Sequence, residues 1–426
     1  MNIDLNKALA LYAITDARPA VELPQAVDLA LRGGAAMIQL RRKNISDDEL
    51  HKLAHKIKHI TDAFNAPLII NDNLKIALQV GCAGVHLGPS DQSISEARTL
   101  LGPDKIVGAT ARTLEQAILA EKAGANYLGS GAMFGSATKL DATAMPLETF
   151  RNICKAVKIP VVAIGGIDRT NISKLRGSGM SGFAIISGIF RSDNIMQATE
   201  HLYNLAMKAL QPRPLLFDLF HTLVNVPTDD LHERTVLGVS KHEWSAYAMT
   251  EDIYYRRATG IVKEPREIMR ELTAQFGRRL SNEALDEMAR LRINRFGNSL
   301  LDVKTEILST LRELKRRGHK LCLVSNADAI DIMRWNDSPL QPLFDDAVFS
   351  CLVGHAKPEP EIYIKAAGLL DENPGDCVFI GDGGTEELMG AKRMGMQTIQ
   401  VQHFWPKEVD YADIMLDNFT DLLDCL

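Results

Sequence analysis

Short apolar runs recur at regular intervals through the first half of the chain, and amphipathic segments separate them. The runs hold at most seven residues and many branched side chains, which is typical of parallel strands buried on both faces. The segments between them, such as residues 21–34 and 46–64, repeat apolar positions with the period of a helix. The predicted strands are LYAIT (11–15), AAMIQLR (35–41), PLIIND (67–72), GVHLG (84–88), KIVGAT (105–110), NYLGSG (126–131), PVVAIGG (160–166) and GFAIIS (182–187).

Eight strand–helix units within about 200 residues predict an α/β fold of the (β/α)8 TIM-barrel type. An open doubly wound sheet is the alternative. The count of eight favours the barrel, and so do the polar residues at most strand ends, because barrel active sites form at the carboxyl ends of strands. Gly33, Gly81 and Gly124 follow predicted helices, and we expect each to end its helix in the left-handed conformation.

A domain boundary is predicted where the last barrel helix, residues 192–210, meets the proline-containing segment QPRP at 211–214. A second α/β domain follows, interrupted by a charged, helix-periodic stretch at about 226–303 that predicts a helical cap. The sequence thus predicts a TIM-barrel domain at 1–211 and a Rossmann-like α/β domain at 212–426. The strands of the second domain are expected at LLFD (215–218), KLCLVSN (320–326), DAVFS (346–350), CVFIGDG (377–383) and TIQVQ (398–402).

Composition narrows the class of protein. With 46% hydrophobic residues, 24% charged residues and a net charge of -6, the chain is globular in composition and lacks the basic excess of a dedicated nucleic-acid binder. Its six cysteines form no CxxC pair, its start shows no basic-then-apolar leader, and no apolar run approaches the roughly 18–20 residues of a membrane span. We therefore expect a cytoplasmic protein without nucleic-acid or membrane partners, and the sequence leaves a homo-oligomer open.

Charged residues at the end of the second predicted strand indicate an anion site. Gln39, Arg41 and Lys43 follow one another at alternate positions of IQLRRK, which places them on one side of the strand. Burying an unpaired charge in a strand costs roughly several kcal/mol. A purely structural role is therefore a poor explanation for an arginine at position 41. A solvated loop explains the neighbouring Arg42 well. Two cations and an amide at a barrel mouth suit a diphosphate or polyphosphate.

Carboxylates follow the next two predicted strands. Asn71 and Asp72 end the third strand, and Asp91 follows the fourth. Taken alone, each aspartate could cap the helix that comes after it. Beside a cluster of cations, a shared magnesium ion is the better explanation, because Mg²⁺ prefers one or two carboxylates together with substrate phosphate oxygens.

The last three strands of the barrel supply a second anion site. Small residues follow the sixth strand, where Ser136, Thr138 and Lys139 offer hydroxyls and a cation. The seventh strand ends in Gly165 and Gly166, and the eighth in Ile186 and Ser187. Loops after the seventh and eighth strands are a recurrent phosphate site of this fold. Two anion sites in one mouth indicate that two phosphorylated substrates are joined there.

These residues resemble the thiamine phosphate synthase family over about residues 8–195, in the stretches LYAITD, MIQLRRK, LIINDN, GVHLGPSD, VGATART, YLGSGAMFGSATKLDA, VVAIGGI and FAIISGI. The resemblance implies that a phosphorylated pyrimidine, 4-amino-5-hydroxymethyl-2-methylpyrimidine diphosphate, is joined to a thiazole phosphate with release of pyrophosphate. Thr110 would face the reacting centre, and Lys139 would both bind the diphosphate and act in catalysis. The resemblance also assigns Gln39, Arg41, Lys43 and Asn71 to the diphosphate, Asp72 and Asp91 to Mg²⁺, and Ser136, Thr138, Gly166, Ile186 and Ser187 to the thiazole phosphate.

The sequence departs from the family pattern at five positions. Asn73 replaces a common arginine, Pro89 a glutamine, Thr110 a serine, and Ala132 and Gly135 prolines. The loss of a cation and an amide could weaken or retune pyrimidine diphosphate binding. Two alternatives follow, a non-catalytic sensor of thiamine-pathway ligands and a barrel like the sibling thiazole tautomerase. The tautomerase relies on a histidine near the end of the fifth strand, where this chain has Thr110-Ala111-Arg112.

The second half carries the parts of a phosphoryl-transfer site. LLFDLFHTLV places Asp218 at the end of its first strand, and Ser325 with Asn326 end a later one. Lys357 follows, and then Asp382 with Glu386 four residues further on, where a short turn could bring both to one metal. A carboxylate nucleophile, a hydroxyl and a lysine for phosphate oxygens, and acids for Mg²⁺ are what this chemistry needs.

In this order the motifs resemble the haloacid dehalogenase superfamily over about residues 214–424, which is rich in Mg²⁺-dependent phosphatases. The resemblance makes Asp218 the nucleophile and a metal ligand. It makes Ser325, Asn326 and Lys357 ligands of the phosphate, and Asp382 and Glu386 further metal ligands. Phe220 is a departure, because these phosphatases usually carry an acid/base aspartate two residues after the nucleophile. A phosphatase limited to good leaving groups, a non-phosphatase member, and a binding or regulatory remnant all stay open, and thiamine phosphate is a candidate substrate.

Overall fold

The computed structural model describes residues 4–17, 19–135, 144–227, 232–248, 250–274, 276–406 and 409–426. The chain forms two compact units, Met1–Gln211 and Pro212–Leu426, and each is considered by itself. No helix among the described residues is long and apolar enough to cross a membrane.

The first unit is a closed barrel of eight parallel strands, which confirms the predicted fold. The alternative of an open sheet is wrong, because the first strand pairs with the last, with Leu11 opposite Phe183. Every predicted apolar run forms a strand, and the strands are β1 (Leu11–Ile14), β2 (Met37–Leu40), β3 (Leu68–Asn71), β4 (Gly84–Leu87), β5 (Ile106–Thr110), β6 (Tyr127–Gly131), β7 (Val161–Ile164) and β8 (Gly182–Ile185).

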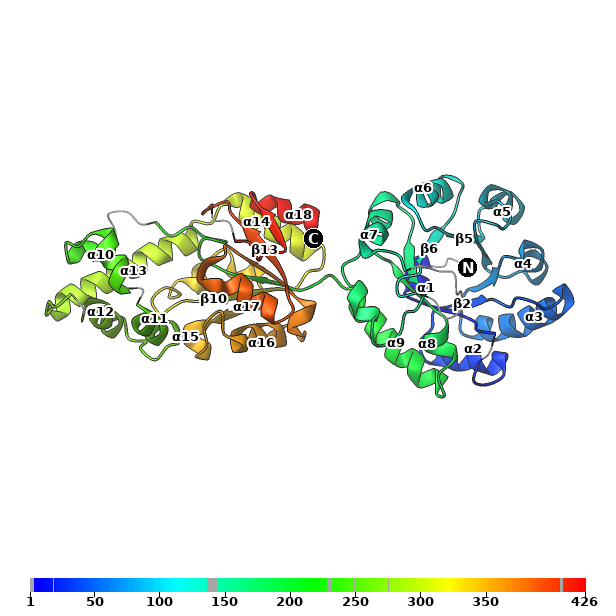
Figure 1. The fold of residues 1–426 in the computed structure, drawn as a ribbon, viewed down its shortest axis with the longest axis horizontal. Helices are drawn as coiled ribbons and strands as arrows, with labels where there is room; N and C mark the ends of the chain where they lie inside the picture. The colour runs from blue at the N-terminus through cyan, green and yellow to red at the C-terminus, as the bar shows by residue number, and fades with distance from the viewer. Residues whose placement is uncertain are drawn as a thin grey trace. The chain divides into compact units, whose positions relative to one another are not determined.

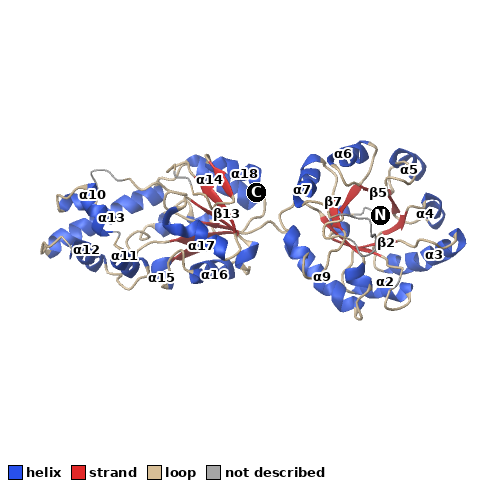
Figure 2. Cartoon of the chain, viewed as in Figure 1, coloured by secondary structure: helices blue, strands red, loops and turns tan. Residues whose placement is uncertain are grey.

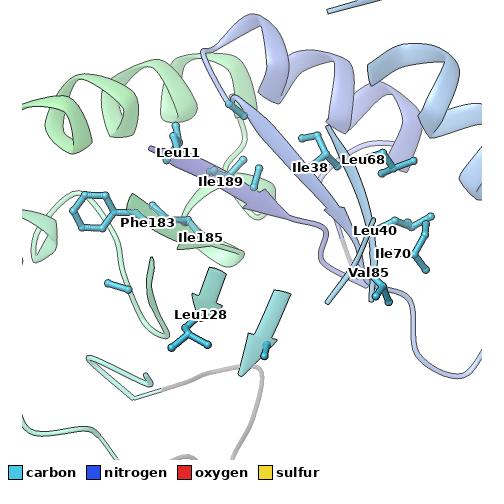
Figure 3. Close-up of a cluster of buried hydrophobic side chains, with 14 of the residues drawn as sticks. Leu11, Ile38, Leu40, Leu68, Ile70, Val85, Leu128, Phe183, Ile185 and Ile189 are labelled. Carbon is cyan, nitrogen blue, oxygen red and sulfur yellow. The ribbon is translucent and has the colours of Figure 1, made fainter. Parts of the chain in front are cut away.

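Helices form a ring outside these strands, as Figure 1 and Figure 2 show. The outward side chains of the strands pack beneath the helices in one large apolar layer, part of which Figure 3 draws. A smaller cluster that includes Tyr12, Met37 and Tyr127 fills the inside of the barrel. The helical elements are α1 (Leu5–Leu9), α2 (Leu23–Arg32), α3 (Asp47–Ala63), α4 (Leu74–Val80), α5 (Ile94–Leu101), α6 (Leu114–Lys122), α7 (Leu147–Ala156), η1 (Ile172–Leu175), α8 (Ser187–Phe190) and α9 (Ile195–Ala209).

Two of the three helix-ending glycines adopt the predicted conformation. Gly81, with φ 65°, and Gly124, with φ 97°, lie in the left-handed region. The prediction for Gly33 is wrong, because its φ is -80°. A side chain is excluded there by packing instead, since a Cβ atom would lie 2.4 Å from the carbonyl oxygen of Met196 in α9.

The second unit contains a six-stranded parallel sheet in the order β11-β10-β9-β12-β13-β14. The strand β14 was not predicted, because it has only three residues and none of them is buried. The strands are β9 (Leu215–Phe217), β10 (Leu321–Ser325), β11 (Asp346–Phe349), β12 (Val378–Gly381), β13 (Gln397–Val401) and β14 (Ile414–Leu416). The helical elements around the sheet are α14 (Thr305–Arg316), η3 (Trp335–Asp337), η4 (Gln341–Leu343), α15 (Ser350–Val353), α16 (Pro360–Leu369), η5 (Pro374–Asp376), η6 (Gly384–Glu386), α17 (Glu387–Arg393), η7 (Phe419–Asp421) and α18 (Leu422–Cys425).

A helical cap interrupts the second unit between β9 and α14, as expected from the sequence. Figure 2 shows its helices grouped beyond one end of the sheet. They pack around an apolar cluster of their own that includes Trp244, Leu272 and Met288. The cap elements are η2 (Glu233–Val236), α10 (Lys241–Ala248), α11 (Glu251–Ala258), α12 (Pro265–Ala274) and α13 (Asn282–Leu301).

Candidate functional site

The carboxyl ends of the barrel strands open into one cavity, where most of the expected barrel site residues meet. Each strand delivers its last residues to this mouth because all strands of the barrel run parallel. Ser136, Thr138 and Lys139 lie outside the described residues. The cavity is lined by Gln39, Arg41, Lys43, Asn71, Asp72, Asp91, Thr110, Gly166, Ile186 and Ser187, among others.

The cation cluster keeps the alternation of a strand beyond the end of β2. The backbone N–H of Arg41 donates to the Thr15 hydroxyl oxygen at 2.8 Å, and that hydroxyl donates to the Arg41 carbonyl oxygen at 3.2 Å. These bonds hold the chain extended past Leu40, so Gln39, Arg41 and Lys43 all line the cavity. Arg42 turns elsewhere, and its Nη1 donates to the carbonyl oxygen of Ala17 at 2.7 Å.

Neither aspartate of the mouth caps a helix, so the capping alternative is wrong for both. Asn73 caps α4, and its Oδ1 accepts from the N–H of Ile76 at 3.0 Å. Ser93 caps α5 in a capping box. Asp91 instead accepts from the N–H of Gly88 at 2.6 Å, and Asp72 adopts a φ of 62°, which is rare for a residue with a side chain. Both carboxyls are therefore available to the cavity.

The Asp72 and Asp91 carboxyls lie so close together that each disfavours the ionised form of the other. Burial and the hydrogen-bonded Asp91 carboxyl together raise the pKa of Asp72 to about 6, although Lys43 acts to lower it. The Nζ of Lys43 lies 3.9 Å from the Asp72 Oδ2. A divalent cation relieves repulsion between paired carboxylates, and Mg²⁺ favours such oxygen donors. The donor set of Asp72 and Asp91 thus fits Mg²⁺.

The glycine pair after β7 allows two loops to approach closely. Gly165 and Gly166 have φ values of 98° and 65°. A Cβ atom on Gly166 would lie 2.7 Å from the carbonyl oxygen of Phe134, which belongs to the loop after β6. Any side chain would therefore collide with this loop at the cavity wall that Ile186 and Ser187 share.

A histidine that was not expected from the sequence lies at the cavity floor. His86 lies in the middle of β4, and its Nε2 is 3.0 Å from the Thr110 Oγ1 at the end of β5. A histidine therefore does lie beside the end of the fifth strand, although the neighbouring strand supplies it. Its signal in the sequence was a titratable side chain inside the buried run GVHLG.

A second cavity lies in the C-terminal unit, between the cap and the carboxyl ends of the strands. Asp218 follows β9, and its N–H donates to the carbonyl oxygen of Ile380 in β12 at 2.9 Å. Its Oδ2 accepts from the Thr222 hydroxyl at 2.9 Å. Asp382, Asn326 and Lys357 line the same cavity, so the parallel sheet brings these expected residues together.

The structure places Glu387 in the carboxylate cluster and corrects the expectation for Glu386. Ligand oxygens of Asp218, Asp382 and Glu387 lie within 4.8 Å of one another. Glu386 is exposed and has a φ of 54°. An ordinary turn after Asp382 would bring Glu386 to the cavity. Gly383, Thr385 and Glu386 all have positive φ values, so the chain returns to the cavity one residue later, at Glu387.

Lys357 lies between two of these acids. Its Nζ donates to the Asp218 Oδ1, and to the Glu387 Oε2 at 2.5 Å. Burial acts to lower the pKa of Lys357, but Asp218 and Glu387 outweigh it and hold the pKa above its ordinary value. Burial raises the pKa of both Asp218 and Glu387. Three acids against one lysine leave an excess of negative charge, so this donor set also fits Mg²⁺.

The hydroxyl and the amide at the end of β10 have different surroundings. The Ser325 Oγ is buried and has no hydrogen-bond partner among the described residues. An unsatisfied buried hydroxyl costs about 1–3 kcal/mol, and a phosphate oxygen would satisfy it. Asn326 binds the backbone of Lys357, accepting from its N–H at 2.7 Å and donating to its carbonyl oxygen at 2.9 Å. Asn326 thus positions Lys357 in addition to lining the cavity.

Phe220 and His221 both line the second cavity. Neighbouring residues of a continued strand would point to opposite sides, but β9 ends at Phe217, so both residues reach the cavity. His221 has a φ of 64° and packs edge-on against Trp405 at 5.6 Å between ring centroids. Phe220 packs edge-on against Phe296 of the cap at 5.1 Å.

A buried ionic cluster joins the cap to the loop after β10. Arg292 of α13 pairs with Glu233 at 2.9 Å, with Asp328 at 3.0 Å and with Asp331 at 2.8 Å. Arg257 pairs with the same Asp328 at 2.9 Å. All five side chains are at least nine-tenths buried, so each charge depends on its partners for the solvation that water would give.

We expect Arg292→Ala to lower the free energy of unfolding of the C-terminal unit by about 3–5 kcal/mol, because three buried carboxylates lose their shared partner. Arg290→Ala in the same helix is the matched control. Arg290 pairs with Glu287 on the exposed surface, and its loss should cost about 0–1 kcal/mol. Urea unfolding of both full-length variants measures the difference, and equal losses would contradict the role of the cluster.

The stability of the cap should also depend on pH through His232. Its Nδ1 accepts from the N–H of Arg234 at 3.2 Å, and burial lowers its pKa from 6.5 to about 4. The unfolded chain therefore binds one proton more than the folded chain between these values, so stability falls as the pH falls from 6.5 towards 4. In His232→Gln the free energy of unfolding should change less steeply across this window, and an unchanged slope would contradict the assignment.

Comparison with known proteins assigns a family to each half. Residues 11–189 match the family model of thiamine monophosphate synthase, and residues 213–395 match that of the haloacid dehalogenase-like hydrolases. Thiamine-phosphate synthase 2 of Streptococcus pneumoniae is 43% identical over 196 residues, which are 46% of this chain and 93% of that protein. Thiamine-phosphate synthase of Caldanaerobacter subterraneus is 45% identical over 186 residues, 43% of this chain and 87% of the relative.

Among solved structures, thiamine phosphate pyrophosphorylase from Pyrococcus furiosus is similar, with a TM-score of 0.46 and 39% identity. It is matched over its whole length by 49% of this chain. The sequence relatives are likewise matched over nearly their whole length, within the first half of the chain alone. The family model and the identity of the sequence relatives show that the chain belongs to the thiamine-phosphate synthase family through its barrel, to which a haloacid dehalogenase-like hydrolase domain is joined.

Proposed function

We propose that the barrel joins 4-amino-5-hydroxymethyl-2-methylpyrimidine diphosphate to thiazole phosphate, giving thiamine phosphate and pyrophosphate. One observation carries this proposal, the meeting of Arg41, Lys43, Asp72 and Asp91 in a single cavity. Cations beside a pair of carboxylates suit a diphosphate held together with a divalent ion. The relatives named above are synthases of thiamine phosphate, which agrees with this chemistry.

The side chains of the cavity suit a reaction in which the protein supplies positive charge to the leaving group and no nucleophile of its own. Arg41 and Lys43 would neutralise the negative charge that grows on the departing pyrophosphate. Asp72 and Asp91 would hold Mg²⁺, which adds positive charge at the same group when bound. Gln39 and Asn71 would orient the diphosphate, and Gly166, Ile186 and Ser187 would hold the thiazole phosphate. The thiazole nitrogen attacks with its own lone pair, so orientation in one cavity supplies the rest.

Two of the five departures from the family pattern, Asn73 and Thr110, have local explanations. Asn73 caps α4, and its Nδ2 donates to Asp47 at 2.9 Å, so this position has a structural role. Thr110 keeps a hydroxyl in the cavity. The synthase is therefore favoured over the sensor.

The full chain incubated with both phosphorylated precursors and Mg²⁺ tests this proposal. We expect pyrophosphate and thiamine phosphate in equal amounts. Binding of the precursors without pyrophosphate release would favour the sensor. Isomerisation of a thiazole precursor without condensation would favour the tautomerase.

For the C-terminal unit we propose hydrolysis of a phosphate monoester. The Asp218 carboxylate would attack phosphorus and expel the alkoxide, which takes a proton from water to become the alcohol. Water would then cleave the aspartyl phosphate, which releases inorganic phosphate and restores the Asp218 carboxylate. Lys357 and the unpartnered Ser325 hydroxyl would hold phosphate oxygens, and Asp218, Asp382 and Glu387 would hold Mg²⁺, which screens the charge of the phosphate when bound. Phe220 cannot protonate the departing oxygen, and such help is worth about 10²–10⁴ in rate. Esters with weakly basic leaving groups should therefore react fastest.

Thiamine phosphate is the substrate that we propose for this site. It is the product of the barrel, and it carries flat heterocyclic rings. The wall of the second cavity includes the aromatic side chains of Phe220, Trp244, Tyr254, Phe296 and Trp405, which suit such rings. Phosphate release from thiamine phosphate should exceed release from an aliphatic ester of equal leaving-group basicity, and equal rates would remove this substrate.

We also propose that the enzyme acts in the cytoplasm and without a nucleic-acid partner. All six cysteines are free, which agrees with a reducing cytoplasm. The net charge of -6 agrees with the absence of a nucleic-acid partner. Sedimentation of the full chain decides whether it is a homo-oligomer.

A further inference from the structure

Five polar side chains from five strands form one continuous hydrogen-bonded chain across the floor of the barrel cavity. The Gln39 Nε2 donates to the Tyr12 hydroxyl oxygen at 2.6 Å, and the hydroxyls of Tyr12 and Tyr127 are 2.9 Å apart. The Tyr127 hydroxyl lies 3.0 Å from the His86 Nδ1, and the His86 Nε2 lies 3.0 Å from the Thr110 Oγ1. The chain thus begins and ends at residues that line the cavity, while Tyr12 and Tyr127 are buried beneath it.

The surrounding structure makes room for this chain. Tyr12 and Tyr127 are 1% and 0% exposed, and they lie among apolar side chains that include Met37. A Cβ atom on Gly108 would lie 2.2 Å from the Tyr127 ring, so the strand next to β6 must carry a glycine there. Phenylalanine would fill the volume of either tyrosine without a buried polar atom. A buried polar network stabilises a fold only when all its members are satisfied, so its presence indicates a role beyond packing.

One arrangement lets each phenol accept one hydrogen bond and donate one within the chain. The Gln39 amide nitrogen only donates, so in this arrangement the Tyr12 oxygen accepts from Gln39 and the Tyr12 proton is directed to the Tyr127 oxygen. The Tyr127 proton is then directed to the His86 Nδ1, which must be unprotonated to accept it. The imidazole proton is therefore on Nε2 and is donated to Thr110.

Burial supports this assignment, because it raises the pKa of Tyr12 and of Tyr127 above the ordinary value. Both side chains are therefore neutral phenols at neutral pH, so each keeps the one proton that the chain requires.

We infer that Tyr12 and Tyr127 are positioning residues for the condensation: they fix His86 as the Nε2–H tautomer, so that Thr110 accepts from His86 and donates its own proton to the bound substrate. This inference rests on the proposed function of the barrel. Tyr12 also anchors the Gln39 amide, which turns the carbonyl oxygen of that side chain away from Tyr12. One chain of bonds thereby sets the orientation of a diphosphate-binding residue and of the hydroxyl at the reacting centre.

Two matched substitutions separate the ends of the chain. Tyr127→Phe removes the donor to the His86 Nδ1 and should lower kcat about 5–10-fold, the worth of roughly one hydrogen bond, with a smaller change in KM. Tyr12→Phe keeps the bond from Tyr127 to His86 but leaves the Gln39 amide without its acceptor. It should mainly raise the KM for the pyrimidine diphosphate. The same loss of kcat in both variants, with KM unchanged, would overturn the inference.

The tautomer can be measured directly by ¹⁵N NMR of the full chain labelled with [¹⁵N]histidine, where His86→Gln identifies the signals of His86. We expect an unprotonated Nδ1 and a protonated Nε2 in the wild type and in Tyr12→Phe, and a shift towards the other tautomer in Tyr127→Phe. A protonated Nδ1 in the wild type would overturn the inference, even if Tyr127→Phe does not fold. A wild type that releases no pyrophosphate but shows the expected tautomer would contradict the synthase proposal alone.

Discussion

Asp72→Asn should lower pyrophosphate release from the two precursors by at least about 100-fold, which corresponds to roughly 2.7 kcal/mol of lost transition-state stabilisation. The substitution keeps the size of the side chain but removes one of the two charges that would hold Mg²⁺. It also leaves Lys43, 3.9 Å away, without its carboxylate partner. The departing pyrophosphate would then lose cationic support in the step where its charge grows. Steady-state rates at saturating Mg²⁺ measure the effect.

The control for this prediction is Asp104→Asn. Asp104 is an exposed residue that precedes β5, at the opposite end of the barrel from the cavity mouth. The same change of charge there should leave the rate within about twofold, because charges separated by more than about 10 Å are largely screened by salt. Thermal unfolding should show that both variants keep the fold. A rate in Asp72→Asn that matches the control would remove the magnesium site from the mechanism.

Asp218→Asn should lower the release of inorganic phosphate by at least about 10³-fold, because an amide cannot act as the nucleophile towards phosphorus. The same change removes one of two carboxylates bonded to Lys357, so that Glu387 becomes its remaining acidic partner. The binding of phosphate should survive better than turnover, since the Ser325 hydroxyl and Lys357 are retained. Phosphate release from thiamine phosphate and from an aryl phosphate measures the loss.

The control for this second prediction is Asp346→Asn. Asp346 begins β11, at the amino-terminal edge of the same sheet, and its Oδ1 accepts from the N–H of Ala347. Hydrolysis should be unchanged there. Pyrophosphate release by the barrel should be unchanged in both variants, because the two sites belong to separate compact units. Persistent hydrolysis in Asp218→Asn would mean that another group attacks phosphorus.

The carboxyl end of each barrel strand could be placed from the sequence, because strand polarity and the period of two are local properties. Arg41 and Lys43 follow β2, and Asn71 ends β3, as the pattern required. Parallel strands then bring their ends to one mouth whatever the loops do. For the same reason the ends of β9 and β12 place Asp218 and Asp382 in one cavity.

Turn geometry was the first property that the sequence could not supply. Which of Glu386 and Glu387 joins the carboxylate cluster depends on three positive φ values after Asp382, and the spacing of residues in the sequence does not reveal them. Likewise, Phe220 and His221 line the same cavity because β9 ends at Phe217. A strand that continued through them would have pointed the two side chains to opposite sides. Each outcome was decided by backbone conformation at one or two residues, where several conformations are open to the same side chains.

The sequence by itself determined the two fold classes and most residues of both cavities, because strands buried on both faces require apolar runs and polar side chains are placed where those runs end. Only the tertiary structure decided which of these residues touch. The chain from Gln39 to Thr110 joins five strands whose members are 115 residues apart at the widest hydrogen bond. The cap cluster likewise brings Arg292 to Asp328. Such contacts form only when the barrel closes and the cap docks. These two events exclude water, and the buried polar groups must then bond to one another.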